Sequence, residues 1–400
     1  MEFRLTDEQY MVRESAQAFL ADVSSPEQVR KAMTQAASYD PAVWQRLCNE
    51  LCLQAITIPE EYGGLGMSYV YLAIVLEEMG RTLFCSPFLA TTAFATNAIL
   101  LAAAHEQKQQ LLPAIAGGET TATLAWAGPN AARRGGTWGA EAISATWQAT
   151  DSGYVLDGEF NYVLDGDTAD LLIIAARATG SCGAAGVSLF AVPADTTGVQ
   201  TTWTPTMDQT RRQAKISLNA VVVDAAMRLG AEGEAWPHLQ KTLALAKIAI
   251  AAEQSGIAAQ SLDMAVAYTM EREQFGRTIA SYQAIKHKAA DMKLKAEVAC
   301  SAVYYAACVA SEVLAPEGDP VLAAELEEAA AMAKGYCSDT VFYNAGNALQ
   351  LFGGVGFTAE YDIQLYFKRA KASELYLGNG AAQRELIAAM LLDAEDASCN

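Results

Sequence analysis

The spacing of apolar residues changes twice along the chain, and the two changes divide the sequence into three parts. Up to about residue 118, and again over 235–395, apolar residues recur with the three-to-four-residue spacing of amphipathic helices. Between these parts they form short runs bounded by turn residues, which is typical of β-strands. The pattern predicts a mainly α-helical protein with a middle β domain, with domains at 1–118, 119–233 and 234–400.

Individual elements can be placed from their local signals. Thr6 and Gln9 match the capping box of a helix start, and Asp40-Pro41 places a proline in the first turn of another helix. Five apolar runs are the predicted strands of a small antiparallel domain: 154–158, 161–166, 171–176, 187–192 and 214–223. The first two end in Asp-Gly pairs, which we interpret as turns. Four periodic runs are the predicted helices of a C-terminal four-helix bundle: 239–270, 279–311, 320–352 and 362–375.

Two glycine turns flank the predicted helix 362–375. Gly353, Gly354 and Gly356 precede it, and Gly378-Asn379-Gly380 follows it. Glycine adopts backbone conformations that other residues resist, and it permits the close approach of a ligand or another chain. The two turns therefore have two interpretations, as C-terminal caps of helices or as ligand contacts at opposite ends of one helix.

Composition narrows the classes of function. The net charge of -19 argues against binding nucleic acid or an anionic membrane surface. Eight scattered cysteines without a CxxC pair indicate reduced thiols, and three histidines argue against a histidine-rich metal site. The N-terminal stretch matches neither a signal nor a transit peptide. The most apolar run, 243–259, contains Lys247 and Glu253 and is not predicted to span a membrane, so we expect a cytoplasmic protein.

Several separated motifs resemble those of acyl-CoA dehydrogenases. Residues 350–361, QLFGGVGFTAEY, followed by Arg369, resemble the C-terminal signature of that family. The R-x-x-F-G segment 272–276 and the loop 58–66 with its following helix resemble further family motifs in the family's order. The resemblance covers nearly the whole chain. It implies a helical N-terminal domain, a β domain and a helical bundle, with FAD as cofactor and an acyl-CoA thioester as substrate.

The resemblance also implies which residues contact the cofactor. In the family, the arginine of the R-x-x-F-G segment reaches an FAD that is bound mainly by a neighbouring subunit. By position this is Arg272, and a guanidinium can hold a pyrophosphate through two hydrogen bonds. Gln274 would hydrogen-bond and Phe275 would pack beside it. The further candidate cofactor contacts are Gln283, Gln350, Gly353, Gly354 and Asn379.

The residues that would face the chain's own flavin depart from the family pattern. Where the family has Thr-Glu-Pro-Gly-Ala-Gly-Ser-Asp, residues 126–134 read WAGPNAARR, and Ala127 has no hydroxyl to offer the flavin. Where the family has Trp-x-Thr-Asn-Gly, residues 162–166 read YVLDG. Trp126 and Tyr162 remain the candidate contacts with the flavin, because the ring of Tyr162 can still stack on it.

The catalytic base is the largest departure. The family's reaction needs a carboxylate that removes the α-proton while a hydride leaves the β-carbon. The two positions that supply this carboxylate in the family correspond to Leu377 and Ala246. Glu253 lies seven residues after Ala246, on nearly the same helical face, and is the remaining candidate base. Its alternative role is a structural carboxylate that pairs with a lysine or caps a helix. Lys247 replaces a family arginine and is a candidate contact for CoA or the substrate carbonyl.

Three functions are therefore compared. The chain is an active acyl-CoA dehydrogenase subunit, or a subunit of a hetero-oligomer that completes a partner's FAD site and has a degenerate site of its own, or a same-fold flavin oxidase. The eroded own-flavin motifs and the retained neighbour-facing motifs resemble the two-plus-two enzymes of bacterial steroid and bulky-acid catabolism. We therefore favour the second function. The implied partners are an acyl-CoA, a second acyl-CoA dehydrogenase-like subunit or another copy in a tetramer, and an electron-transfer flavoprotein.

Overall fold

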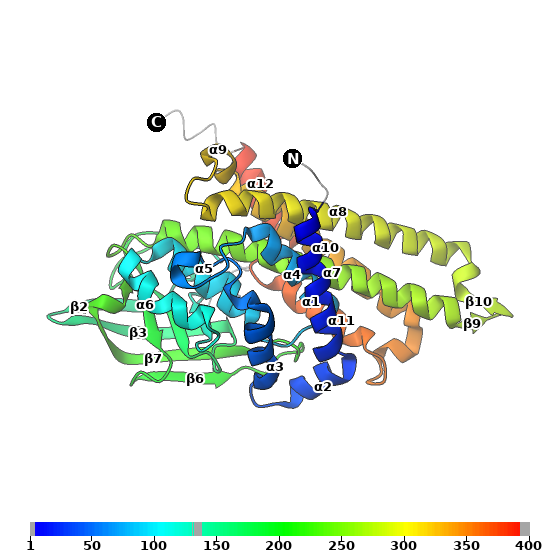
Figure 1. Cartoon of the computed structure of the whole chain (residues 1–400), viewed down its shortest axis with the longest axis horizontal. Helices are drawn as coiled ribbons and strands as arrows, with labels where there is room; N and C mark the ends of the chain where they lie inside the picture. The colour runs from blue at the N-terminus through cyan, green and yellow to red at the C-terminus, as the bar shows by residue number, and fades with distance from the viewer. Residues whose placement is uncertain (1–4, 130, 132–137, 393–400) are drawn as a thin grey trace. The chain divides into compact units, whose positions relative to one another are not determined.

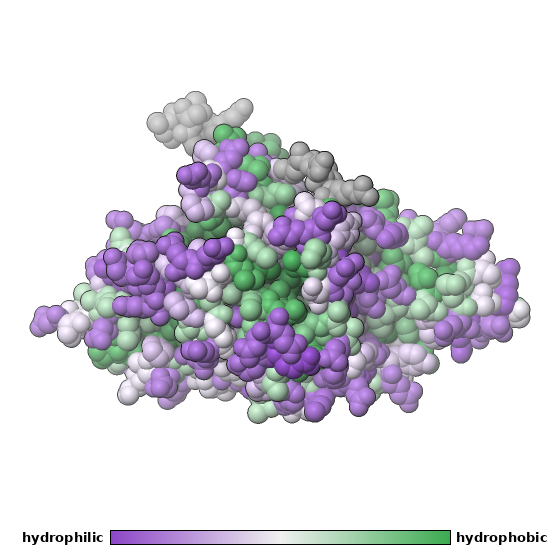
Figure 2. Space-filling model, viewed as in Figure 1, coloured by the Kyte–Doolittle hydropathy of each residue, from purple (hydrophilic) through white to green (hydrophobic). Residues whose placement is uncertain are grey.

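A computed structural model describes residues 5–129, 131 and 138–392. The chain forms two compact units. The first contains residues 1–31, 69–84 and 247–400, and the second contains residues 32–68 and 85–246. Hydrophilic residues cover much of the face shown in Figure 2, as expected for a chain in which 18% of the residues are charged.

The first unit is helical (Figure 1). Its helices are α1 (Asp7–Val23), the start of α2 (Pro26–Thr34), α4 (Tyr69–Arg81), α7 (Trp236–Glu271) from residue 247 onward, α8 (Gln283–Leu314), α9 (Pro320–Ala323), α10 (Leu326–Phe352), α11 (Ile363–Leu375) and α12 (Gly380–Leu392). The predicted long helices are confirmed within a few residues. The exception is the run 320–352, which is divided into α9 and α10.

Two of the predicted helix starts have the capping geometry that the sequence indicated. The Thr6 hydroxyl accepts a hydrogen bond from the Gln9 backbone N–H at 3.2 Å, and the Gln9 side chain accepts one from the Thr6 N–H at 3.0 Å. In the second unit, Asp40 caps α3 (Pro41–Arg46) by accepting from the Ala42 N–H at 2.9 Å. Both caps satisfy N–H groups that a helix start leaves without partners.

Two glycines bring α4 and α7 into direct backbone contact. A Cβ atom at Gly80 would lie 2.2 Å from the Glu253 carbonyl oxygen, and one at Gly256 would lie 1.9 Å from the Glu77 carbonyl oxygen. No side chain other than hydrogen fits at such distances. The crossing therefore fixes the backbone of α7 next to Glu253.

The second unit contains an eight-stranded sheet. Its strands are β1 (Ala122–Ala125), β2 (Thr146–Thr150), β3 (Gly153–Leu164), β4 (Leu171–Ala178), β5 (Val187–Pro193), β6 (Val199–Trp203), β7 (Gln213–Asp224) and β8 (Arg228–Leu229). The order is β6-β7-β3-β2-β4-β5-β8, with β1 beside β4. Most pairs are antiparallel as predicted, but β1–β4 and β2–β4 are parallel.

The remaining helices of the second unit are short. They are α3, η1 (Leu47–Leu51), η2 (Leu53–Ala55), η3 (Glu60–Tyr62), η4 (Leu89–Ala95), α5 (Thr96–Ala102), α6 (His105–Ala116), η6 (Ala140–Ala142) and η7 (Ala225–Met227). The sheet core is rich in aromatic rings, with Tyr154 packed edge-on against both Trp147 and Phe190.

One predicted turn of the β domain is wrong. Asp157-Gly158 does not end a strand, because β3 continues through it as a bulge against β7. Gly158 has φ 147°, and a Cβ there would lie 2.5 Å from the Ala145 Cα. The Asp157 carboxylate accepts a hydrogen bond from the Ala220 N–H at 2.7 Å across the irregularity. The pair therefore shapes a bulge instead of a hairpin turn.

Helix α8 is the one described helix whose length and composition reach those of a membrane span. A third of its most apolar window is buried within the molecule. Core helices of soluble proteins meet the same criterion, so length and composition alone do not assign α8 to a membrane.

Candidate cofactor and substrate site

The R-x-x-F-G segment forms a small hairpin between α7 and α8 (Figure 1). Strands β9 (Glu273–Gln274) and β10 (Arg277–Thr278) pair antiparallel, and Phe275 and Gly276 form the two-residue turn. Both turn residues have positive φ, 55° and 78°. This suits a type I′ turn, but a phenylalanine with positive φ is strained. Such strain is common at functional sites.

Several side chains of this hairpin have groups that are available for binding. Phe275 is 93% exposed. The exposed Arg272 side chain has no hydrogen bond or ion pair to any residue that the structure describes. Among the described residues, the Gln274 amide donates only to the adjacent Glu273 carbonyl, at 2.9 Å. An apolar ring, a guanidinium and an amide are thus available together for a contact outside this chain.

Stacked aromatic rings place the glycine turn that follows α10, the second predicted cofactor segment, beside the hairpin. The ring of Tyr268, one turn before Arg272, stacks on Phe352 with centroids 4.2 Å apart. Tyr361 packs edge-on against both rings. Because Gly353 directly follows Phe352, the end of α10 lies beside the end of α7. The hairpin at Arg272 and the glycine turn at Gly353 are about eighty residues apart in sequence. They are nevertheless neighbours in the structure, as a shared cofactor surface requires.

The backbone after α10 is open. Gly353 has φ 68°, and a Cβ added at Gly353 or Gly354 would meet no atom within 4 Å. Gln350, in the last turn of α10, is exposed. An open glycine backbone, an amide and an unpaired guanidinium suit a ligand that contains a pyrophosphate. The donor set of this surface therefore fits FAD.

Two other predicted cofactor residues lie at helix starts. Gln283 is the exposed first residue of α8, next to Tyr282, whose hydroxyl donates to the Gln274 carbonyl at 3.1 Å. Asn379 precedes α12, and its side-chain oxygen accepts from the Ala382 N–H at 3.0 Å. Gln283 therefore belongs to the hairpin surface, whereas the oxygen of Asn379 is used as a helix cap.

In the second unit, the two predicted own-flavin segments also meet. The Asn161 N–H donates to the Ala127 carbonyl at 2.9 Å, which joins the chain after Trp126 to the chain before Tyr162. Tyr162 is half-buried and has φ 60°. Trp126 is 2% exposed, and its ring stacks on Phe94.

The remainder of the eroded 126–134 segment is only partly described. Asn130 and residues 132–134 lie outside the described residues. Ala127 itself is buried, and its carbonyl already accepts the Asn161 N–H. Its side chain is a methyl group, which offers no hydrogen bond.

The candidate base is engaged in an ion pair. Glu253 on α7 accepts from Arg369 on α11 at 2.7 Å, and the two side chains are 2% and 1% exposed. A buried carboxylate needs such a partner, since burial of an isolated charge is costly. The partner is an arginine, not the lysine named in the structural alternative. It comes from the C-terminal signature that carried the family resemblance.

The turn that holds the usual base position is fixed through its carbonyl groups. Leu377 is 1% exposed and has φ 59°. Its carbonyl accepts from the Gln383 side chain at 2.7 Å, and the Gly378 carbonyl accepts from Lys334 at 2.9 Å. The Leu377 N–H has no partner among the described residues. A buried N–H without a partner is rare, and it can donate to a carbonyl oxygen of a ligand.

Sequence reasoning missed Lys334 and Gln383. The available signal was a lysine inside the apolar run AAAMAKGYC of α10. Lysines are almost never fully buried unless they are paired. That position therefore deserved to be named as a candidate site residue.

Lys247 on α7 is a second buried lysine of the first unit. It is 9% exposed, and no hydrogen bond or ion pair joins it to another described residue. Burial lowers the pKa of its ammonium, against the attraction of Glu327. A nearly buried cation without a bonded partner suits an anionic or carbonyl ligand.

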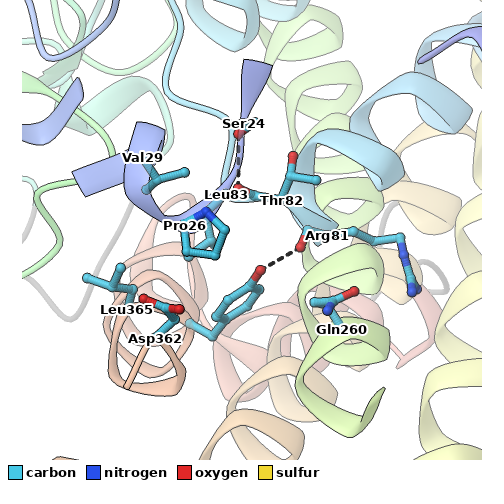
Figure 3. Close-up of a pocket in the computed structure, with 10 residues that line it drawn as sticks. Ser24, Pro26, Val29, Arg81, Thr82, Leu83, Gln260, Asp362 and Leu365 are labelled. Carbon is cyan, nitrogen blue, oxygen red and sulfur yellow. Dashed lines mark hydrogen bonds between the residues drawn. The ribbon is translucent and has the colours of Figure 1, made fainter. Parts of the chain in front are cut away.

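A separate cavity of about 180 Å³ lies among α2, α4, α7 and α11, lined by residues that include Val29, Gln260 and Leu365 (Figure 3). None of the predicted site residues lines it. Its two charged side chains are paired, Arg81 with Asp263 at 2.5 Å and Asp362 with Arg30 at 2.6 Å. The cavity therefore offers no unpaired charge to a CoA ligand.

Two family profiles match the chain. "Acyl-CoA dehydrogenase, N-terminal domain" matches residues 6–119, and "Acyl-CoA dehydrogenase, C-terminal domain" matches residues 233–392. Together with the helical, sheet and helical order, they establish that the chain belongs to the acyl-CoA dehydrogenase family of FAD-dependent oxidoreductases. The family resemblance, the fold class and the cofactor are thereby confirmed.

Individual relatives span nearly the whole chain. Acyl-CoA dehydrogenase IpdE2 of Mycolicibacterium smegmatis is 33% identical over 374 residues, covering 94% of this chain and 96% of that protein. Butyryl-CoA dehydrogenase of Megasphaera elsdenii has a TM-score of 0.86 at 27% identity and covers 98% of this chain and 100% of its own. The Tcur3481-Tcur3483 steroid ACAD has a TM-score of 0.83 at 26% identity and covers 98% and 99%.

Proposed function

We propose that this chain is an acyl-CoA dehydrogenase subunit that completes the FAD site of a second subunit, in an enzyme that introduces an α,β double bond into an acyl-CoA. The observation that carries the proposal is the joined surface of the hairpin and the end of α10. There the Arg272 side chain has no hydrogen bond or ion pair to a described residue, Phe275 is exposed, and a Cβ at Gly353 or Gly354 would meet no atom within 4 Å. Such a surface suits a cofactor that is held by another chain.

Each residue of this surface has a distinct role in the proposal. Arg272 would hold the pyrophosphate of FAD, because guanidinium and phosphate form charge-assisted hydrogen bonds. Phe275 would pack beside the cofactor, and Gln350 and Gly354 would contact its adenine end. When bound, FAD supplies the hydride acceptor of the reaction.

The chain's own reaction site lacks a free carboxylate at the family positions. Leu377 and Ala246 are apolar, and Glu253 is paired with Arg369. We therefore assign Glu253 a structural role and the base to the partner subunit. The Leu377 N–H and Lys247 still offer a donor and a cation, so this chain retains groups that suit a CoA thioester.

The relatives support a class of substrate and an assembly. One relative is IpdE2, and another is a steroid ACAD whose name joins two components. From these relatives we propose that the substrate carries a bulky, steroid-derived acyl group and that the enzyme is a tetramer made of dimer pairs. We further propose a cytoplasmic location and an electron-transfer flavoprotein as electron acceptor.

We expect the chain to be oligomeric whenever FAD is bound. Arg272 and Gln350 can contact FAD in this proposal only if a neighbouring subunit supplies it. Light scattering on the FAD-loaded protein should give the mass of at least two chains. A stable monomer that retains FAD would contradict the proposal.

We also expect the chain purified alone to hold less than one FAD per chain. Ala127 has lost the hydroxyl that faces the flavin in the family, so the chain's own flavin site has lost a hydrogen bond. The absorbance spectrum of the pure protein measures this content, and adding the partner subunit should raise it. The same protein heated to release its flavin provides the baseline.

A self-sufficient homo-oligomer is the second candidate function. Within the first unit it is favoured by the fixed turn at Leu377. Within the second unit it is favoured by the meeting of the Trp126 and Tyr162 segments. A yellow protein with one FAD per chain in the absence of any partner would support it. A same-fold oxidase is less well supported, because the base of those enzymes would also occupy position 377.

A further inference from the structure

The cavity in Figure 3 is not used by the proposed function, and the residues that line it all belong to the first unit. Its volume is about 180 Å³. Protein interiors are close-packed, and voids larger than a water molecule are few. An engineered apolar cavity of about 150 Å³ in another protein binds benzene. This cavity can therefore accept a six-membered ring with one small substituent.

One part of the cavity wall is mostly apolar. Pro26 and Val29 come from α2, Leu83 follows α4, and Leu365 and Tyr366 come from α11. Val29 is 4% exposed and Tyr366 is 8% exposed, so packing holds both side chains in place. An ordered water needs about two to four polar partners, which an apolar wall does not offer. This part of the cavity therefore suits a hydrocarbon group, and the aromatic side chain of Tyr366 suits a planar ring.

Most polar side chains of the wall already have partners. The Tyr366 hydroxyl donates to the Arg81 carbonyl at 2.6 Å, and the Ser24 hydroxyl donates to the Thr82 carbonyl at 3.2 Å. The charged groups of Arg81 and Asp362 are both in ion pairs. A ligand without charge can therefore enter the cavity and leave these contacts intact, whereas a charged ligand would have to compete with the paired groups.

Gln260 is the exception among the polar side chains of the wall. It lies on α7, is half-buried, and its amide has no hydrogen bond to a residue that the structure describes. Figure 3 shows it on the opposite side of the cavity from Val29 and Leu365. An amide both donates and accepts hydrogen bonds, so a second amide can pair with it through two of them. A carboxylate only accepts, so it can form only one of the two.

We propose that this cavity binds a small neutral ring compound that carries an amide group, with the ring against Tyr366 and the amide paired with Gln260. The site shares no residue with the proposed FAD surface, and the proposal does not depend on that function. On α11, Tyr366 lies about one turn before Arg369. On α7, Gln260 lies about two turns after Glu253. A ligand held between these two helices therefore binds next to the buried Glu253–Arg369 pair and stabilises the folded unit.

The test uses benzamide and benzoate, which have nearly the same shape but differ in charge and in hydrogen-bond donors. Calorimetry on the full chain with excess FAD gives the two dissociation constants. Benzamide should bind the wild-type protein about tenfold more tightly than benzoate. Gln260→Leu should weaken benzamide binding about tenfold, as the loss of two hydrogen bonds predicts. Val29→Phe adds a ring to the cavity wall and should abolish benzamide binding.

Gln364→Leu is the matched control. Gln364 is a half-buried glutamine on α11 that is not among the residues that line the cavity. This variant should bind benzamide as the wild type does. Gln260→Leu changes a half-buried position and decides the matter if Val29→Phe does not fold. A Gln260→Leu protein with the wild-type affinity for benzamide would refute the proposal, and so would a wild-type protein that binds no benzamide or that prefers benzoate.

Discussion

Glu253→Gln should lower the free energy of unfolding by about 3 kcal/mol or more, the cost of breaking a buried ion pair by removing one partner. The substitution keeps the shape of the side chain but removes the carboxylate with which the buried Arg369 guanidinium, 1% exposed, is paired. Total stabilities of proteins are about 5–15 kcal/mol, so this loss is large. Denaturant midpoints followed by circular dichroism measure it.

Two further variants test whether the loss of stability in Glu253→Gln comes from the buried ion pair. Glu50→Gln removes the acidic partner of an exposed pair with Arg46 and should change the stability by less than about 1 kcal/mol. Glu253→Gln combined with Arg369→Met should be more stable than Glu253→Gln alone, because both charges of the buried pair are then removed. A Glu253→Gln protein that unfolds at the wild-type denaturant concentration but no longer reduces its flavin with an acyl-CoA would instead identify Glu253 as the base.

Arg272→Ala should weaken FAD binding by the oligomer about 10- to 150-fold, the equivalent of about 1.5–3 kcal/mol for a charge-assisted hydrogen bond. The exposed side chain has no partner among the described residues of its own chain, so its removal leaves no contact within the chain unsatisfied. Residual FAD after dialysis and a fluorescence titration of the depleted protein both report the change.

The control for Arg272→Ala is Arg384→Ala. Arg384 is an exposed arginine on α12 that pairs with Asp339 at 2.5 Å, away from the hairpin. It removes the same charge from the same helical unit and should leave the FAD content unchanged. Equal FAD contents of wild type and Arg272→Ala would remove the main support for a shared cofactor site.

The sequence predicted elements wherever local signals and family motifs agree. Thr6 and Asp40 cap the helices that they were predicted to start, and α10 ends at Phe352, directly before the predicted glycine turn. The Asp157-Gly158 turn failed because the same dipeptide also suits a bulge, and only the opposing strand β7 decides between the two. The parallel placement of β1 beside β4 depends on long-range pairing that no local pattern encodes.

Only the residues of the candidate site that lie in family motifs could be predicted from the sequence. The resemblance named Arg272 and Gly353, but the stacking of Tyr268 on Phe352 that joins their segments is a tertiary contact. The partner of Glu253 could not be chosen from sequence, because Arg369 lies 116 residues away. Lys334 was missed because two of its three acceptors are backbone carbonyls, which every residue has and which sequence therefore cannot distinguish.

The glycine contact between α4 and α7 affects how loss-of-function variants of this protein should be interpreted. At Gly80 and Gly256 even an added methyl group would overlap backbone atoms of the other helix. An alanine scan would therefore score both positions as intolerant although they lie outside the proposed cofactor surface. Genetic screens for activity alone would place them among the reaction's residues. If the amount of folded protein is measured together with activity, residues at such helix contacts can be separated from residues that bind FAD.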